Sequence, residues 1–135
     1  MSKQLTILLT EGNATLREVV ARSLIRQGYH VRTASDDKAA LAILATDDVH
    51  LLLLDLTSPE TNGLAVLQYV QKEHRGRFPY VVVLSGVLTE EDQRKIQELG
   101  ADEYLLKPFL LSQLFERVQE LEHRLRRGEE PEPSS

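Results

Sequence analysis

The stretch Leu51-Leu52-Leu53-Leu54-Asp55 decides the fold, because four consecutive leucines followed by one acid are typical of a strand buried on both faces of a sheet. A lone carboxylate at the end of such a run is costly to bury. Pro59 and the pair Asn62-Gly63 follow within eight residues and indicate a turn. Asp55 is therefore expected on a loop that leaves the sheet, which is where functional sites are commonly built.

Three other strand-like runs also end in polar residues. If all four strands are parallel, their carboxyl ends meet at one edge of the sheet. Two acids, a hydroxyl and an ammonium group are then expected to converge there. The runs are Leu5 to Leu9 before Thr10-Glu11, Tyr80 to Leu84 before Ser85-Gly86, and Tyr104 to Leu106 before Lys107-Pro108.

Segments of helical period separate these runs. Asn13, Ser35 or Asp36, and Thr89 are candidate helix caps, and Gly28 is placed to end the first helix. Strand and helix alternate roughly five times, which predicts an α/β fold with a parallel sheet, helices on both faces and right-handed crossovers. The residues expected to face inward include Leu16, Val19, Val20 and Leu24 in the first helix and Leu64, Leu67 and Val70 in the third.

Composition limits the class of protein. With 135 residues, 41% of them hydrophobic, the chain is expected to form one domain over residues 1–127, with the acidic, proline-rich residues 128–135 as a disordered tail or linker stub. The net charge of −5 argues against a nucleic-acid-binding surface. Because there is no cysteine, disulfides and zinc–thiolate sites are excluded. No long apolar stretch follows the start, so a cytoplasmic protein without membrane contact is expected.

Three motifs in order make the chain resemble a response-regulator receiver domain, the phosphoacceptor module of two-component signalling. The resemblance covers residues 4–125 and implies a flavodoxin-like, doubly wound five-stranded parallel sheet with strand order 2-1-3-4-5. Each motif alone is weak, and their order makes the resemblance specific. They are Leu53-Leu54-Asp55 with Pro59 and Gly63, Val83-Leu84-Ser85-Gly86, and the run from Gly100 to Phe109 that includes Tyr104 and Lys107-Pro108.

The resemblance also implies roles for four residues. Asp55 is the expected phosphoacceptor, Ser85 the hydroxyl that follows the phosphoryl group, and Lys107 its cationic partner. Tyr104 is the aromatic residue whose rotamer would report the state of the switch, and a fixed packing role remains the alternative. The Lys107–Pro108 bond is expected to be cis.

A divalent metal, normally Mg²⁺, is the second cation that such a site needs, because carboxylate and phosphoryl groups are both anionic. Domains of this family generally carry two adjacent acids after the first strand. Here Glu11 aligns with the first acid and Gly12 with the second, which is the family's direct metal ligand. The implied ligands are Glu11, Asp55 and the main-chain carbonyl of Thr57, and Mg²⁺ is expected to bind weakly or not at all.

The leading hypothesis is a receiver module that takes a phosphoryl group onto Asp55 from a sensor histidine kinase or phosphotransfer protein and signals to an output domain or partner protein. Any enzymatic activity would be limited to its own phosphorylation and dephosphorylation. A pseudo-receiver, an interaction module regulated without phosphate, is the alternative that Gly12 favours. A flavodoxin-like cofactor binder is disfavoured, because no glycine-rich phosphate-binding loop follows the first strand.

The last helix, expected from Leu111, carries an apolar stripe at coiled-coil spacing among alternating arginines and glutamates. The stripe either packs on the sheet or, in its later part, continues past it. From the second reading we expect a weak homodimer through the last two helices, with ion pairs around an apolar centre. The stripe consists of Leu114, Val118, Leu121 and Leu125.

Overall fold

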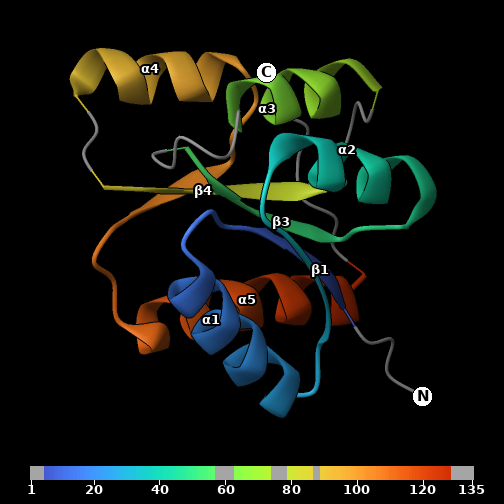
Figure 1. The fold of residues 1–135 in the computed structure, drawn as a ribbon. Helices are drawn as coiled ribbons and strands as arrows, with labels where there is room; N and C mark the ends of the chain where they lie inside the picture. The colour runs from blue at the N-terminus through green and yellow to red at the C-terminus, as the bar shows by residue number, and fades with distance from the viewer. Residues whose placement is uncertain (1–4, 57–62, 74–78, 87–88, 129–135) are drawn as a thin grey trace.

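A computed structural model of the chain describes residues 5–56, 63–73, 79–86 and 89–128. Within these residues, five parallel strands form one sheet in the order β2-β1-β3-β4-β5, and a helix follows each strand. Figure 1 shows α2, α3 and α4 on one face of the sheet and α1 and α5 on the other. The elements are β1 (Thr6–Thr10), α1 (Ala14–Arg26), β2 (His30–Ala34), α2 (Asp37–Thr46), β3 (Leu51–Asp55), α3 (Gly63–Glu73), β4 (Tyr80–Ser85), α4 (Glu90–Glu98), β5 (Glu103–Leu106) and α5 (Leu111–Arg126).

The predicted α/β class and the strand order are therefore confirmed. Every residue of β3 is buried, as expected for a central strand covered by helices on both faces. Parallel register aligns the strand ends, since Thr10 pairs with Leu54, Asp55 with Leu84, and Ser85 with Leu106. The polar residues that end these strands consequently lie along one edge of the sheet.

Two hydrophobic cores lie on opposite faces of the sheet, because successive strand residues point to opposite sides. Leu53 and Leu9 face the core beneath α1 and α5, whereas Leu52, Leu54 and Leu8 face the core beneath α2, α3 and α4. The leucine run of β3 therefore contributes to both cores, which explains why it is apolar at every position before Asp55.

Short-range capping fixes where the helices begin. Asn13 Oδ1 accepts the Leu16 N–H at 2.9 Å, and Asp36, rather than Ser35, caps α2 by accepting the Ala39 N–H at 2.8 Å. Thr89 caps α4 in a reciprocal arrangement with the side chain of Asp92. Beyond the end of α1, Gly28 has a φ of +99°, a left-handed conformation that favours glycine.

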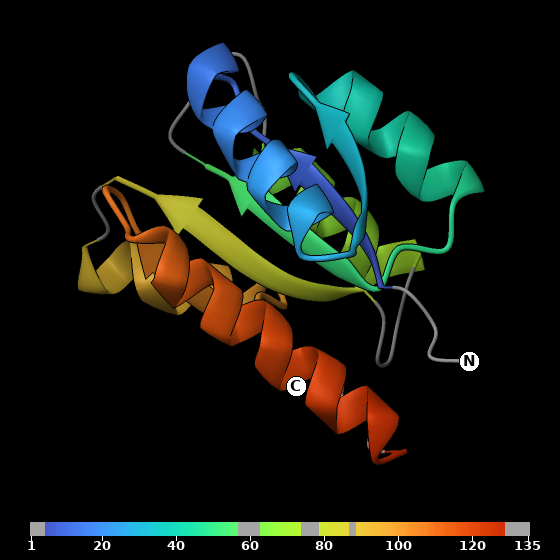
Figure 2. The same cartoon turned by 90° about the horizontal axis from the view of Figure 1, so that it is seen from below.

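Parts of the predicted helix faces are wrong. Val19 and Leu64 were expected to point inward, but they are 45% and 38% exposed. Of the two readings of the α5 stripe, the structure favours packing on the sheet for Leu121, which is only 2% exposed and belongs to the core beneath α1 and α5. Leu125 is partly buried against the same core, and Figure 2 shows α1 and α5 on the side of the sheet that faces the viewer. The apolar stripe therefore packs within the domain, as the first of its two readings predicts, and a homodimer through the last two helices remains a prediction.

Helix α4 has the smallest buried face of the five. Its only buried residue is Ile96, and three acids, Glu90, Glu91 and Asp92, occupy its first turn. Tyr104 on β5 contacts this helix by donating its hydroxyl to Gln93 Oε1 at 3.0 Å. None of the helices in the described residues is long and apolar enough to cross a bilayer.

Candidate functional site

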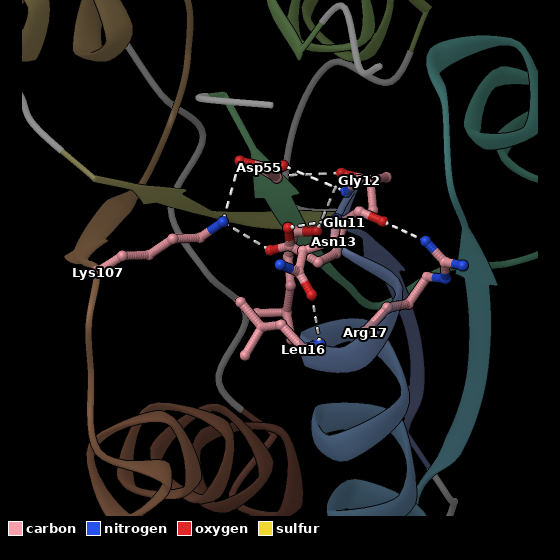
Figure 3. A network of polar contacts seen from close by, with 9 residues as sticks. Glu11, Gly12, Asn13, Leu16, Arg17, Asp55 and Lys107 are labelled. Carbon is pink, nitrogen blue, oxygen red and sulfur yellow. Dashed lines mark hydrogen bonds and ion pairs between the residues drawn. The ribbon is translucent and has the colours of Figure 1, made fainter. Parts of the chain in front are cut away.

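Asp55 lies at the centre of a polar cluster at the carboxyl edge of the sheet (Figure 3). Its side chain is fully buried, and Oδ1 lies 3.2 Å from the ammonium nitrogen of Lys107. The Gly12 N–H donates to Oδ2 at 3.3 Å. The two carboxylate oxygens are thus held from opposite sides by the loops that follow β5 and β1.

Glu11 is the second buried acid of the cluster. Its Oε1 lies 2.7 Å from the Lys107 ammonium nitrogen, closer than that nitrogen lies to Asp55. Its Oε2 accepts the Asn13 N–H at 3.1 Å, and its own N–H donates to the Ala34 carbonyl at 3.1 Å. The structure therefore brings together Glu11, Asp55 and Lys107, and we name these three residues the carboxyl-edge cluster.

Thr10 links the end of β1 to the backbone of β3 next to Asp55. Its hydroxyl donates to the Leu53 carbonyl at 3.4 Å and accepts the Asp55 N–H at 3.2 Å. Both contacts cross from the end of β1 to the end of β3 and are buried. Sequence reasoning named Thr10 only as the polar residue that ends the first run and did not assign it this role.

Arg17 contributes to the site and was missed by sequence reasoning. From the first turns of α1, its Nη1 donates to the main-chain carbonyl of Glu11 at 2.7 Å (Figure 3). The only hint in the sequence is its position: Arg17 lies four residues after the candidate cap Asn13, close enough for its side chain to reach the loop before the helix.

Ser85 and Tyr104 occupy different parts of the site. Ser85 is buried at the end of β4, and its main-chain carbonyl accepts the Lys107 N–H at 2.7 Å, next to the expected cis Lys107–Pro108 bond. Tyr104 lies one strand further out and turns toward α4 through its bond to Gln93. The predicted ligand Thr57 lies outside the described residues.

The glycine at position 63, which belongs to the first motif, is required for a steric reason. A Cβ atom at this position would lie 2.8 Å from the Asp55 main-chain oxygen and 2.1 Å from Leu56 Cδ2. Only glycine lets the start of α3 approach the backbone of the buried acid this closely.

The charges of the carboxyl-edge cluster do not cancel. Two carboxylates face one ammonium group, which leaves a formal charge of −1 in a place almost closed to solvent. Glu11 and Asp55 supply hard oxygen ligands of the kind that hold Mg²⁺ together with several waters. The described residues contain no group of three or more acids, histidines or cysteines that could hold a metal. These oxygens fit Mg²⁺, and Glu11 and Asp55 are the described residues that would hold it.

A second charged cluster lies along α5, far from Asp55 in the sheet. Its members are joined by ion pairs such as Arg117–Glu103 at 2.9 Å and by tyrosine hydroxyls that donate to glutamates. Burial first, and then the neighbouring Glu122, raises the pKa of Tyr29 to about 12, while burial and Glu103 raise the pKa of Tyr80. We name these residues the α5 cluster: Tyr29, Tyr80, Glu103, Arg117, Glu122, Arg124 and Arg126.

The doubly wound parallel sheet thus carries a buried acid, a second acid and a lysine together at its carboxyl edge. The family model described as the response regulator receiver domain matches residues 7–119. The chain belongs to this family, which confirms the resemblance seen in the sequence. Domains of this family generally bind Mg²⁺ for phosphorylation.

Curated relatives are consistent with this assignment. The chain is 34% identical over 117 residues to a response regulator of Streptococcus pneumoniae, RR06, covering 87% of this chain and 52% of that protein. It is 32% identical over 122 residues to the transcriptional regulatory protein CusR of Escherichia coli, covering 90% and 52%. The chain therefore spans about half the length of the relatives it matches.

Solved structures support the fold. A receiver domain from Bermanella marisrubri superposes with a TM-score of 0.77 at 28% identity, covering 88% of this chain and 98% of that chain. The receiver domain of a Francisella response regulator gives a TM-score of 0.81 at 24% identity, covering 90% and 99%.

Proposed function

We propose that the chain accepts a phosphoryl group on Asp55 from the phosphohistidine of a sensor histidine kinase or phosphotransfer protein. One observation carries the proposal: a fully buried carboxylate has a lysine ammonium 3.2 Å from one oxygen and a main-chain N–H on the other. Such an arrangement is expensive unless the site binds an additional group, since it holds two acids for one cation. The proposed domain is residues 1–127, with residues 128–135 as a tail or linker.

In the proposed transfer, a carboxylate oxygen of Asp55 forms a bond to phosphorus while the bond between phosphorus and the histidine nitrogen breaks. The electron pair of that bond stays on the nitrogen, and the histidine, which carries a proton on its other ring nitrogen, leaves as neutral imidazole. Lys107 stabilises the charge that spreads over the phosphoryl oxygens, and the Gly12 N–H orients the carboxylate. Ser85 lies at the neighbouring strand end, where we propose that its hydroxyl follows the phosphoryl group.

Bound Mg²⁺ would neutralise further charge on the phosphoryl oxygens. Glu11 and Asp55 are the described residues that would hold it, and the carbonyl of Thr57 is the third proposed ligand. Gly12 removes the acid that is the family's direct ligand, so we propose weaker binding than in a domain with both acids. Gly12 does not adopt a positive φ, so no left-handed backbone conformation opposes a side chain at this position. Gly12→Asp should therefore tighten Mg²⁺ about tenfold in a calorimetric titration, and equal affinities would contradict the metal argument.

The direct test of the acceptor uses a small phosphodonor, acetyl phosphate, with Mg²⁺, followed by intact-mass measurement. The wild-type chain should gain one phosphoryl group, and Asp55→Asn should gain none because it lacks the nucleophile. Asp48→Asn, which changes an exposed acid outside the cluster, is the matched control and should behave as wild type. A phosphorylated species that persists in Asp55→Asn would move the site elsewhere.

The second candidate function is a pseudo-receiver that regulates a partner without phosphate. The Lys107 ammonium lies closer to Glu11 than to Asp55, and Gly12 stands in place of the metal-binding acid; both features favour it. If the wild-type chain gains no mass while Gly12→Asp does, this candidate replaces the first. In either case we propose that Tyr104, α4 and α5 form the surface that acts on an output domain or partner protein.

A further inference from the structure

The peptide group between Glu11 and Gly12 connects Arg17 to Asp55. Its N–H donates to Asp55 Oδ2 at 3.3 Å, and its carbonyl accepts from Arg17 Nη1 at 2.7 Å. This peptide is trans, so its N–H and C=O point in opposite directions. Figure 3 shows the consequence: Asp55 and the Arg17 guanidinium lie on opposite sides of the loop at Gly12.

A guanidinium on the carbonyl makes the N–H of the same peptide a stronger donor, because hydrogen bonds in a chain polarise one another. The loop that carries this peptide is fixed at three further points. The Glu11 N–H is bonded to Ala34, its carboxylate is bonded to Asn13 and Lys107, and Asn13 caps α1. Arg17 therefore acts on a peptide that is already aimed at Asp55.

The placement of Arg17 runs against the ordinary charge preference of helices. The N-terminus of a helix favours acids and disfavours cations, and α4 follows this rule with three acids in its first turn. Helix α1 has no acid in its first turn, and Arg17 follows directly after that turn. Electrostatic stabilisation of α1 does not explain an arginine here, whereas an anion at Asp55 does.

Arg17 also completes the charge balance of the site. Lys107 is shared between two carboxylates and lies nearer to Glu11, so it neutralises Asp55 only in part. Arg17 is half-buried and brings the formal charge of the four groups from −1 to 0. Its charge reaches Asp55 on the side of Gly12, where the family's second acid and its metal would otherwise stand.

We infer that Arg17 is a positioning residue that polarises the Glu11–Gly12 peptide toward Asp55 and so lowers the dependence of this site on a divalent metal. The inference rests on the proposed function for its effect on phosphorylation. Arg17 itself touches neither carboxylate in the structure, and its influence on Asp55 passes through the peptide.

The test compares Arg17→Met, which keeps the length of the side chain and removes its charge, with Arg22→Met on the same helix. Arg22 is a matched control because its exposed guanidinium pairs with Glu18 on the surface of the same helix. Arg17→Met should slow phosphorylation by acetyl phosphate in the presence of a metal chelator about tenfold, since the peptide loses its polarising charge. The same variant should bind Mg²⁺ alone several-fold more tightly, because the site becomes more negative. Arg22→Met should change neither quantity.

The opposite directions of these two effects separate positioning from a structural role. A variant that merely disturbs the loop would lose both phosphorylation and Mg²⁺ affinity, and that result would overturn the inference. Indistinguishable behaviour of Arg17→Met and Arg22→Met would overturn it as well. Arg17→Lys keeps the charge and a donor, so it should restore most of the metal-free rate.

A measurement on the unphosphorylated protein distinguishes this inference from the proposed function. The amide proton of Gly12 should shift upfield in the NMR spectrum of Arg17→Met, because its hydrogen bond to Asp55 weakens, and should stay in place in Arg22→Met. If the wild-type chain gains no phosphoryl group under any condition, the proposed function fails. The Gly12 resonance and the Mg²⁺ titration then decide on Arg17, and an unmoved resonance overturns its role.

Discussion

The carboxyl-edge cluster and the α5 cluster are both built from ion pairs of 2.7 to 3.4 Å, but they differ in burial. In the first, the side chains of Glu11, Asp55 and Lys107 are 2%, 0% and 18% exposed. In the second, the arginines Arg117 and Arg126 are about half exposed. Distance alone therefore does not rank these contacts, because water screens one set and is largely excluded from the other.

The largest effect is expected for Lys107→Met, which leaves two carboxylates buried without their ammonium group. Removing one partner of a buried pair typically costs about 3–5 kcal/mol, so the free energy of unfolding at neutral pH should fall by about that amount. Urea denaturation followed by circular dichroism measures it. A loss below about 1 kcal/mol would mean that the buried cluster behaves like a surface pair.

The next prediction concerns the α5 cluster, whose contribution to the free energy of unfolding should depend on pH. Because the pKa of Tyr29 is raised from about 10 to about 12, the neutral phenol stabilises the fold fully below pH 10, and this contribution is lost as the pH rises through 12. Stability should drop by about 1–2 kcal/mol over this range after allowance for solvent screening. Urea midpoints at several alkaline pH values test this. Tyr29→Phe should reduce the drop, while the contribution of Tyr80, whose pKa burial also raises, remains. An unchanged drop in that variant would assign the loss to other groups.

A smaller effect of opposite sign is expected for Asp55→Asn. The substitution removes one of two like charges. Lys107 then keeps its ion pair with Glu11, the nearer of the two carboxylates. The free energy of unfolding should rise by about 1 kcal/mol, a stabilisation that accompanies loss of the proposed activity. Thermal unfolding of both proteins gives the comparison. A clear fall in the melting temperature would show that Asp55 stabilises the folded state more than its excess charge destabilises it.

The smallest effect is expected where the α5 cluster is most exposed. Arg126→Ala breaks an i, i+4 pair with Glu122 at 3.4 Å, and such pairs contribute about 0.3–0.5 kcal/mol. The change should be detectable only at low salt and should vanish at high salt because of screening. An effect near that of Lys107→Met would remove the distinction between the two clusters.

The convergence of Glu11, Asp55 and Lys107 could be predicted from the sequence, because each follows an apolar run and parallel strands end at one edge. Thr10 and Arg17 could not be assigned their contacts, since both bind main-chain atoms and residue type does not reveal such partners. The sequence left two readings of the stripe that contains Leu121 open, for a different reason. A spacing of three and four residues describes a core face and a coiled-coil seam equally well, and only the path of α5 over the sheet separates them.

Because the buried face of α4 is small, a signal would need little free energy to displace this helix. Ile96 is the single buried residue of α4, and hydrogen bonds from Tyr104 to Gln93 and from Gln71 to the Glu98 carbonyl connect the helix to β5 and α3. With so little buried apolar surface, α4 is expected to open locally at a lower cost than the other helices. Helices such as α1 and α5, each with three buried residues, open only at a higher cost. A signal that displaces α4 would therefore need to supply less free energy than one that displaces α1 or α5.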